Sequence, residues 1–95
     1  MASISHNTYF DGGVQSLGFE RDGHRATVGV IEPGEFRFDT GAPERMTVVA
    51  GELSVLRPGS TQWQSFTTGD VFEVPGSSAF EIRAGEPSAY LCEFL

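Results

Sequence analysis

The sequence predicts a single all-β domain, a small barrel or sandwich of short strands with little or no helix. Its 95 residues leave no room for a second core, so residues 1–95 form one domain. A hydrophobic share of 39% with eight Phe is enough to build that core. The 12 Gly and five Pro are spread along the chain, as tight turns between strands require. No window combines a 3.6-residue apolar period with helix caps.

The N-terminal half is expected to begin with a frayed segment, residues 1–6, and to continue as four strands. Asp11-Gly12-Gly13 ends the first strand. Asp22-Gly23 supplies the positive φ of a tight hairpin between the second and third, and Pro33-Gly34 turns the chain into the fourth. The expected strands are residues 7–10, 14–20, 25–31 and 35–39.

The second half continues with the same pattern of short alternating runs and turn residues. A turn with Gly41 and Pro43 opens it, and Gly51 separates the next two runs. Three further turns contain Pro58-Gly59, Gly69-Asp70 and Pro75-Gly76. The expected strands are residues 45–50, 52–57, 63–66, 71–74, 79–83 and 89–95, so that nine strands follow the short entering one at residues 7–10.

The closing strand is apolar on both faces. Tyr90, Cys92 and Phe94 share one face, and Leu91 and Leu95 share the other. A strand of this kind needs cover on both sides. Loops of the same chain or a second copy of the protein would both provide it, and we expect a homodimer.

Charge and cysteine content narrow the classes of partner. The formal net charge of −7 disfavours binding to nucleic acids and to anionic membrane surfaces. Cys92 is the only cysteine, so no internal disulfide forms. No apolar run approaches the ~20 residues that span a bilayer, and no secretory signal opens the chain. We expect a cytoplasmic protein.

No strong catalytic motif is present. His6 and His24 lie in the expected frayed segment and beside a turn, and neither has a partner at metal-ligand spacing. The sequence instead favours a pocket. Phe36 and Phe38 share one face of their strand, and Phe80 is a candidate to join them. They form either ordinary core or an apolar slot with stacking faces for a planar base.

Polar candidates for the same pocket are few. A guanidinium presents a fork of donors to an anion, although most arginines are solvated surface charges. Glu44 lies three residues before Thr47, where its carboxylate either hydrogen-bonds sugar hydroxyls or satisfies backbone N–H groups at the rim. The candidate anion-binding arginines are Arg25, Arg37 and Arg83.

Three stretches together resemble the small single-domain cupins: residues 34–52, residues 69–76 and the ending Tyr90-Leu91-Cys92. Glu44, six intervening residues and Gly51 match the second half of the first cupin motif. Gly69, five intervening residues and Pro75 match the opening of the second. The run from Pro43 to Val48 and the Tyr-Leu-Cys ending resemble, more specifically, the pyrimidine/purine nucleoside phosphorylase family, over residues 7–95. This resemblance implies a cupin-type β-barrel, or jelly roll.

The sequence departs from the metal-binding cupins at the positions of their ligands. The Phe36-Arg37-Phe38-Asp39 region stands where those cupins place two His, and Phe80 stands where they place a third. Glu44 alone does not hold a transition metal. We therefore expect no metal and no cofactor.

The resemblance implies phosphorolysis of nucleosides, with orthophosphate as co-substrate, to free base and α-D-ribose 1-phosphate. In this interpretation Arg25 holds phosphate, and Glu44 and Thr47 contact the ribose or phosphate. Stacking contacts accept purines and pyrimidines alike. The residues expected to wall the base are Phe36, Phe38, Phe80 and Tyr90. Two alternatives stay open: a metal-free cupin module that binds a sugar-like or nucleoside ligand without catalysis, and a structural dimer whose pocket is core.

Overall fold

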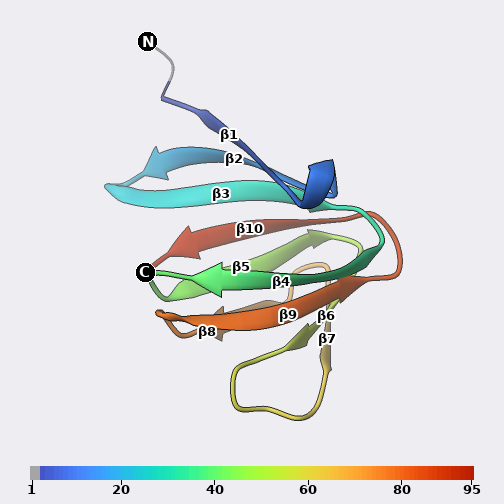
Figure 1. Cartoon of the computed structure of the whole chain (residues 1–95). Coiled ribbons are helices and arrows are strands. Elements are labelled where there is room, and N and C mark those ends of the chain that lie inside the picture. The colour runs from blue at the N-terminus through green and yellow to red at the C-terminus, as the bar shows by residue number, and fades with distance from the viewer. Residues whose placement is uncertain (1–2) are drawn as a thin grey trace.

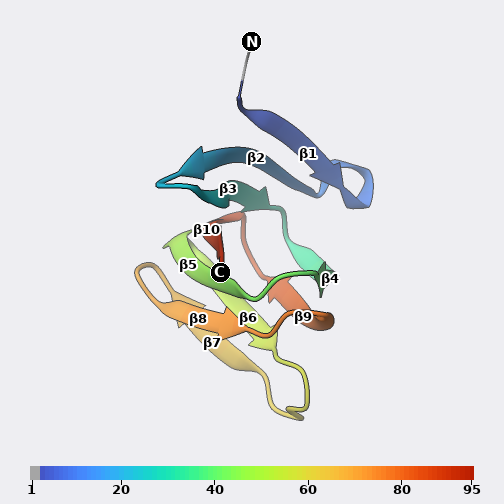
Figure 2. The same ribbon diagram turned by 90° about the vertical axis from the view of Figure 1, so that its left-hand side faces the viewer.

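A computed structural model describes residues 3–95 as two antiparallel β-sheets packed face to face (Figures 1 and 2). The larger sheet has six strands, in the order β1 (Ser5–Tyr9), β2 (Val14–Arg21), β3 (His24–Ile31), β10 (Ser88–Phe94), β5 (Glu44–Ala50) and β8 (Val71–Val74). The smaller has four, in the order β4 (Gly34–Thr40), β9 (Ser78–Ala84), β6 (Glu52–Leu56) and β7 (Gln64–Thr67). A three-residue 3-10 helix, η1 (Phe10–Gly12), joins β1 to β2.

The predicted all-β jelly roll is confirmed. From β3 to β6 each turn carries the chain from one sheet to the other, and the chain changes sheet again between β7 and β10. The two sheets do not close into one continuous barrel but pack as a sandwich. Figure 2 shows β1 at one end of the molecule and β7 at the other.

Strand positions agree with the expected segments to within two residues at every boundary. The 71–74 strand has the expected bounds. The hairpin between β2 and β3 places Asp22 and Gly23 at φ 52° and 77°, as its Asp-Gly turn predicts. The expected frayed segment is wrong for Ser5 and His6, because β1 begins at Ser5 and pairs with β2. Residues 1–2 lie outside the described residues.

The core lies between the sheets because strand alternation turns every second side chain inward. On β5, for example, Met46 and Val48 are almost fully buried, and on β9 Phe80 and Ile82 face them from the other sheet. Burying a side chain of this size stabilises the fold by about 1.5–3 kcal/mol. The rest of the core comprises Val14, Ile31, Leu53, Val55, Phe72, Val74, Ala84, Tyr90 and Cys92.

The outer face of the larger sheet is apolar and exposed. Val28 and Val30 on β3, and Leu17 beside them on β2, are 42–56% exposed. Val49 and Val71 continue the same surface on β5 and β8. The strand β10 lies in the middle of this sheet, so the outward side of the closing strand is part of an apolar sheet face that the folded chain leaves in contact with solvent. No helix in residues 3–95 has the length and apolar character that crossing a membrane requires.

Candidate functional site

A cavity of about 470 Å³ opens between the sheets at the end nearest β1 and η1. Aromatic side chains from four elements form much of its wall, and a few polar groups also line it. A pocket of this size with apolar walls and few convergent polar groups is typical of a small-molecule site. The aromatic residues are Tyr9, Phe10, Phe38, Tyr90 and Phe94, and the polar ones in the interior are Ser16, Thr27, Glu44 and Cys92.

Glu44 is the acidic residue buried in this cavity, with 8% of its surface exposed. It is the first residue of β5 and pairs with Phe94 of β10, so the inward side chain two residues back along β10 is that of Cys92. Cys92 Sγ donates a hydrogen bond to Glu44 Oε1 at 3.3 Å. Burial raises the pKa of the Glu44 carboxyl above its usual value, while the hydrogen bond from Cys92 lowers it.

The thiol of Cys92 stays protonated in this setting. Burial raises its pKa well above the usual range, and the nearby Glu44 carboxylate raises it further. A hydrogen bond with Thr27, the residue directly opposite on β3, acts in the other direction. Because a thiolate and not a thiol is the nucleophile, Cys92 is a hydrogen-bond donor here.

Tyr90 forms part of the cavity floor, and its position depends on a glycine. Its ring lies against the backbone of Gly29, which is its partner across the β3–β10 ladder. A Cβ at Gly29 would come within 2.6 Å of Tyr90 Cε1 and nearer still to Cζ and the hydroxyl. Burial, followed by the charges of Cys92, Tyr9 and Glu44, raises the pKa of Tyr90 well above its usual value. The phenol therefore stays neutral.

The aromatic wall joins both sheets. The ring centroid of Phe38 lies 5.4 Å from that of Phe80 and 6.3 Å from that of Tyr90. Phe10 packs on Phe36 and Phe38 at 5.0 and 6.3 Å. Its backbone is left-handed at φ 54°, an uncommon conformation for an aromatic residue. Of the four residues expected to wall the base, Phe38 and Tyr90 line the cavity, while Phe36 and Phe80 do not but pack against other aromatic rings of the wall.

The three residues expected to act on ribose or phosphate are not brought together. Glu44 points inward, but Thr47 lies three residues further along the same strand and therefore faces outward, beside Val71 and Leu91. Arg25 faces inward on β3, two residues from Thr27. Its guanidinium lies over Gly18 and donates to Ser5 Oγ at 2.8 Å, at the wall of a separate hollow near the β2–β3 hairpin.

Several cavity residues were not among the candidates from the sequence. Tyr9 and Phe10 belong to the segment expected to be a short entering strand, and Ser16 and Thr27 have no motif around them. Cys92 was grouped with Tyr90 and Phe94 on one face of the closing strand but without a role. Its pairing with Glu44 depends on the β5–β10 register, which joins residues 48 positions apart.

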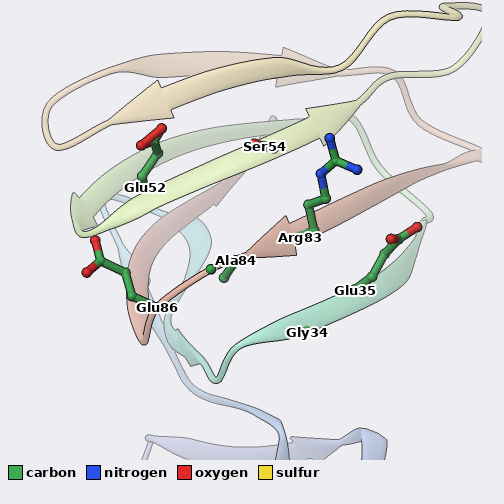
Figure 3. A pocket seen from close by; sticks show the side chains of 8 residues that line it. Gly34, Glu35, Glu52, Ser54, Arg83, Ala84 and Glu86 are labelled. Atoms are coloured by element: carbon green, nitrogen blue, oxygen red, sulfur yellow. The ribbon is translucent and has the colours of Figure 1, made fainter.

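A second hollow, of about 690 Å³, lies on the outer face of the smaller sheet (Figure 3). The carboxylates of Glu35, Glu52 and Glu86 are spread around its rim. Arg83 also lines it (Figure 3), and its guanidinium carbon lies 4.0 Å from the centre of the Trp63 ring. Its lining is charged and open to solvent and lacks stacking faces, so the inner cavity is the candidate site. Nowhere in residues 3–95 do three His, Cys, Asp or Glu side chains gather as a metal site would need, and the expectation of no metal stays a prediction.

Known proteins match the chain over nearly its whole length. Residues 4–94 match the pyrimidine/purine nucleoside phosphorylase family. A pyrimidine/purine nucleoside phosphorylase of Sorangium cellulosum is 61% identical, in an alignment that covers 97% of this chain and 99% of that protein.

Solved structures support the fold. A crystal structure of a Vibrio parahaemolyticus protein of unknown function shares 52% identity, with a TM-score of 0.95 over 99% of this chain and all of that one. A cupin-2 domain protein from Shewanella frigidimarina is 18% identical, with a TM-score of 0.66 over 78% of this chain and 72% of that one. This second likeness shows the cupin fold alone.

Proposed function

Since the chain belongs to the pyrimidine/purine nucleoside phosphorylase family, we propose that it splits nucleosides with orthophosphate into free base and α-D-ribose 1-phosphate. The structural observation that carries this proposal is a buried carboxylate, Glu44, facing an aromatic-walled cavity of about 470 Å³. Such a cavity is of the size that encloses a small ligand.

The aromatic wall suits the nucleobase. Phe38 and Tyr90 line the interior, and Phe10, which is about half exposed, packs on Phe38. Stacking on such rings contributes about 1–3 kcal/mol per base and depends little on which base is bound. This supports a broad specificity for purine and pyrimidine nucleosides.

Glu44 suits the sugar. Cleavage of a glycosidic bond develops positive charge at the anomeric carbon and ring oxygen, and a carboxylate in a water-poor cavity stabilises that charge. The same carboxylate accepts hydrogen bonds from ribose hydroxyls. Thr47, on the other face of β5, is left out of the proposed site.

The phosphate requires a cation close to this carboxylate. Arg25 keeps its proposed role only if its guanidinium leaves Ser5, because it lies outside the cavity, on the inward face of β3 two residues from Thr27. Arg37 on β4 lines the cavity itself, so its substitution should be compared with that of Arg25. If Glu44→Gln and Arg25→Ala both leave phosphorolysis intact, the proposed site is in the wrong place.

We also propose that the protein is a cytoplasmic homodimer formed through the outer face of the larger sheet. The apolar side chains on that face come from neighbouring strands, including Leu17, Val28 and Val71, and about half of each is exposed. A contiguous apolar sheet face of this kind is typical of a protein interface. An isologous dimer would cover β10 from outside.

The first experiment uses purified, metal-stripped protein. Uridine or inosine is incubated with and without orthophosphate, and free base is quantified by chromatography. Base released only with phosphate is the expected result. If nucleosides raise the melting temperature but no base is released, the chain is a binding module without turnover.

A further inference from the structure

The Glu44 carboxylate is held from one side only. Among the described residues, Cys92 is the partner to which the structure hydrogen-bonds it, through Oε1. Every fully buried side-chain oxygen or nitrogen in residues 3–95 has a hydrogen-bond partner. The other oxygen of Glu44, which has no such bond, is therefore in contact with the open space of the cavity rather than sealed in the core.

The bond from Cys92 is itself fixed by strand register. Cys92 lies directly opposite Thr27 on β3 and Met46 on β5, and both neighbours point inward. Thr27 lowers the pKa of Cys92 as a hydrogen-bonding neighbour, and the Thr27 hydroxyl, the thiol and the Glu44 carboxylate come from three adjacent strands. Turning the thiol away from Glu44 would break its hydrogen bond to Oε1.

From this geometry we propose that Cys92 is a positioning residue for Glu44. Its S–H group occupies one carboxylate oxygen, so that the other projects into the cavity to accept hydrogen bonds from ribose hydroxyls. The inference rests on the proposed phosphorolysis. It assigns no covalent step to the thiol.

The carboxylate must be ionised to act in this way. Burial raises its pKa, and the Cys92 hydrogen bond opposes that rise. Other titratable or charged groups also face the cavity: Tyr90 from β10, Tyr9 from β1, and Arg37 and Asp39 from β4. None of these is hydrogen-bonded to Glu44 in the described residues, so removal of the thiol is the most direct way to alter the carboxylate.

The test compares Cys92→Ala with Cys92→Ser in the pH dependence of kcat/KM for phosphorolysis. In the wild type the rate falls at acid pH as Glu44 takes up a proton. Without the S–H donor this fall moves to higher pH, and kcat/KM drops roughly fivefold, the factor that corresponds to a net hydrogen bond of about 1 kcal/mol. The hydroxyl of Cys92→Ser restores the wild-type profile.

Val55→Ala is the matched control, because Val55 is buried in the smaller sheet and does not line the cavity. It lowers the melting temperature as Cys92→Ala does, yet leaves the pH profile in place. A Cys92→Ala profile that coincides with that of Val55→Ala overturns the proposal, since Cys92 then acts only through packing.

A second measurement does not depend on activity. Cys92 is the only cysteine, so its S–H stretching band in the infrared spectrum has a single source. We expect the band to shift as Glu44 is titrated and to lose that shift in Glu44→Gln. If the band shifts with pH but the protein shows no phosphorolysis, the proposed function is wrong while the Cys92–Glu44 hydrogen bond is retained. If the band is the same in wild type and Glu44→Gln at every pH, the hydrogen bond itself is refuted.

Discussion

Replacement of Gly29 by Ala tests the floor of the cavity. Gly29 is partnered across the ladder by Tyr90, whose ring occupies the space where a side chain at residue 29 would stand. An added Cβ would lie 2.6 Å from Tyr90 Cε1, whereas carbon atoms in contact are about 3.5–4.0 Å apart. The ring must therefore move by about 1 Å or more, into the cavity.

The cost follows from that movement. Extra atoms forced into a packed interior destabilise a protein by about 1–3 kcal/mol. In a domain of this size each kcal/mol lowers the melting temperature by about 4–8 °C, so we expect a loss of roughly 5–20 °C. The displaced ring also narrows the cavity, so KM for nucleosides rises.

Thermal unfolding followed by circular dichroism measures this effect. Gly85→Ala is the control, because a Cβ at Gly85 meets nothing within 4 Å and the same change in backbone entropy is made there. Tyr90→Leu in the Gly29→Ala background should recover part of the loss, as expected for two residues in contact. If Gly29→Ala and Gly85→Ala have the same melting temperature, the position of the Tyr90 ring does not depend on Gly29, and this description of the cavity is wrong.

Three further predictions concern the carboxylate, the aromatic wall and the outer face. The raised pKa of Glu44 means that the folded state binds its proton more tightly than the unfolded state, so wild-type stability falls as pH rises above the usual 4.5. The melting temperature of Glu44→Gln, relative to that of wild type at the same pH, should therefore rise as the pH is raised from 4.5 to 7. Phe38→Ala should raise KM for nucleosides by about tenfold, from the loss of a stacking face, while Phe38→Leu raises it less. Val28→Asp should convert the proposed dimer to a 10.3 kDa monomer by light scattering, and Ser54→Asp, on the outer face of the smaller sheet, should not.

The fold could be predicted largely from local signals. Alternation and turn residues are properties of neighbouring positions, and they placed nearly every strand, including residues 71–74 without error. The start of β1 was missed because Ser5 and His6 are polar and are ordered by pairing with β2 rather than by burial of apolar surface.

The site depends on information that neighbouring positions do not contain. Glu44 and Thr47 were grouped by closeness in sequence, yet an interval of three residues on a strand turns them to opposite faces. Glu44 and Cys92, far apart in sequence, meet because β5 and β10 are adjacent. The register between strands far apart in the chain cannot be deduced from one sequence. The family resemblance therefore indicated the type of reaction, while the structure shows which side chains lie next to Glu44.

The position of β10 has a consequence for how the molecule folds. Its partners β3 and β5 both precede it and do not pair with each other, so the larger sheet exists as two separate pieces until β10 enters between them. Pairings across such long stretches of chain are slow to form. Tyr90 and Cys92 arrive with this strand, so the cavity is completed in the step that joins the two pieces. In a refolding experiment, recovered activity should therefore report the last event of folding and lag behind the formation of the β2–β3 hairpin.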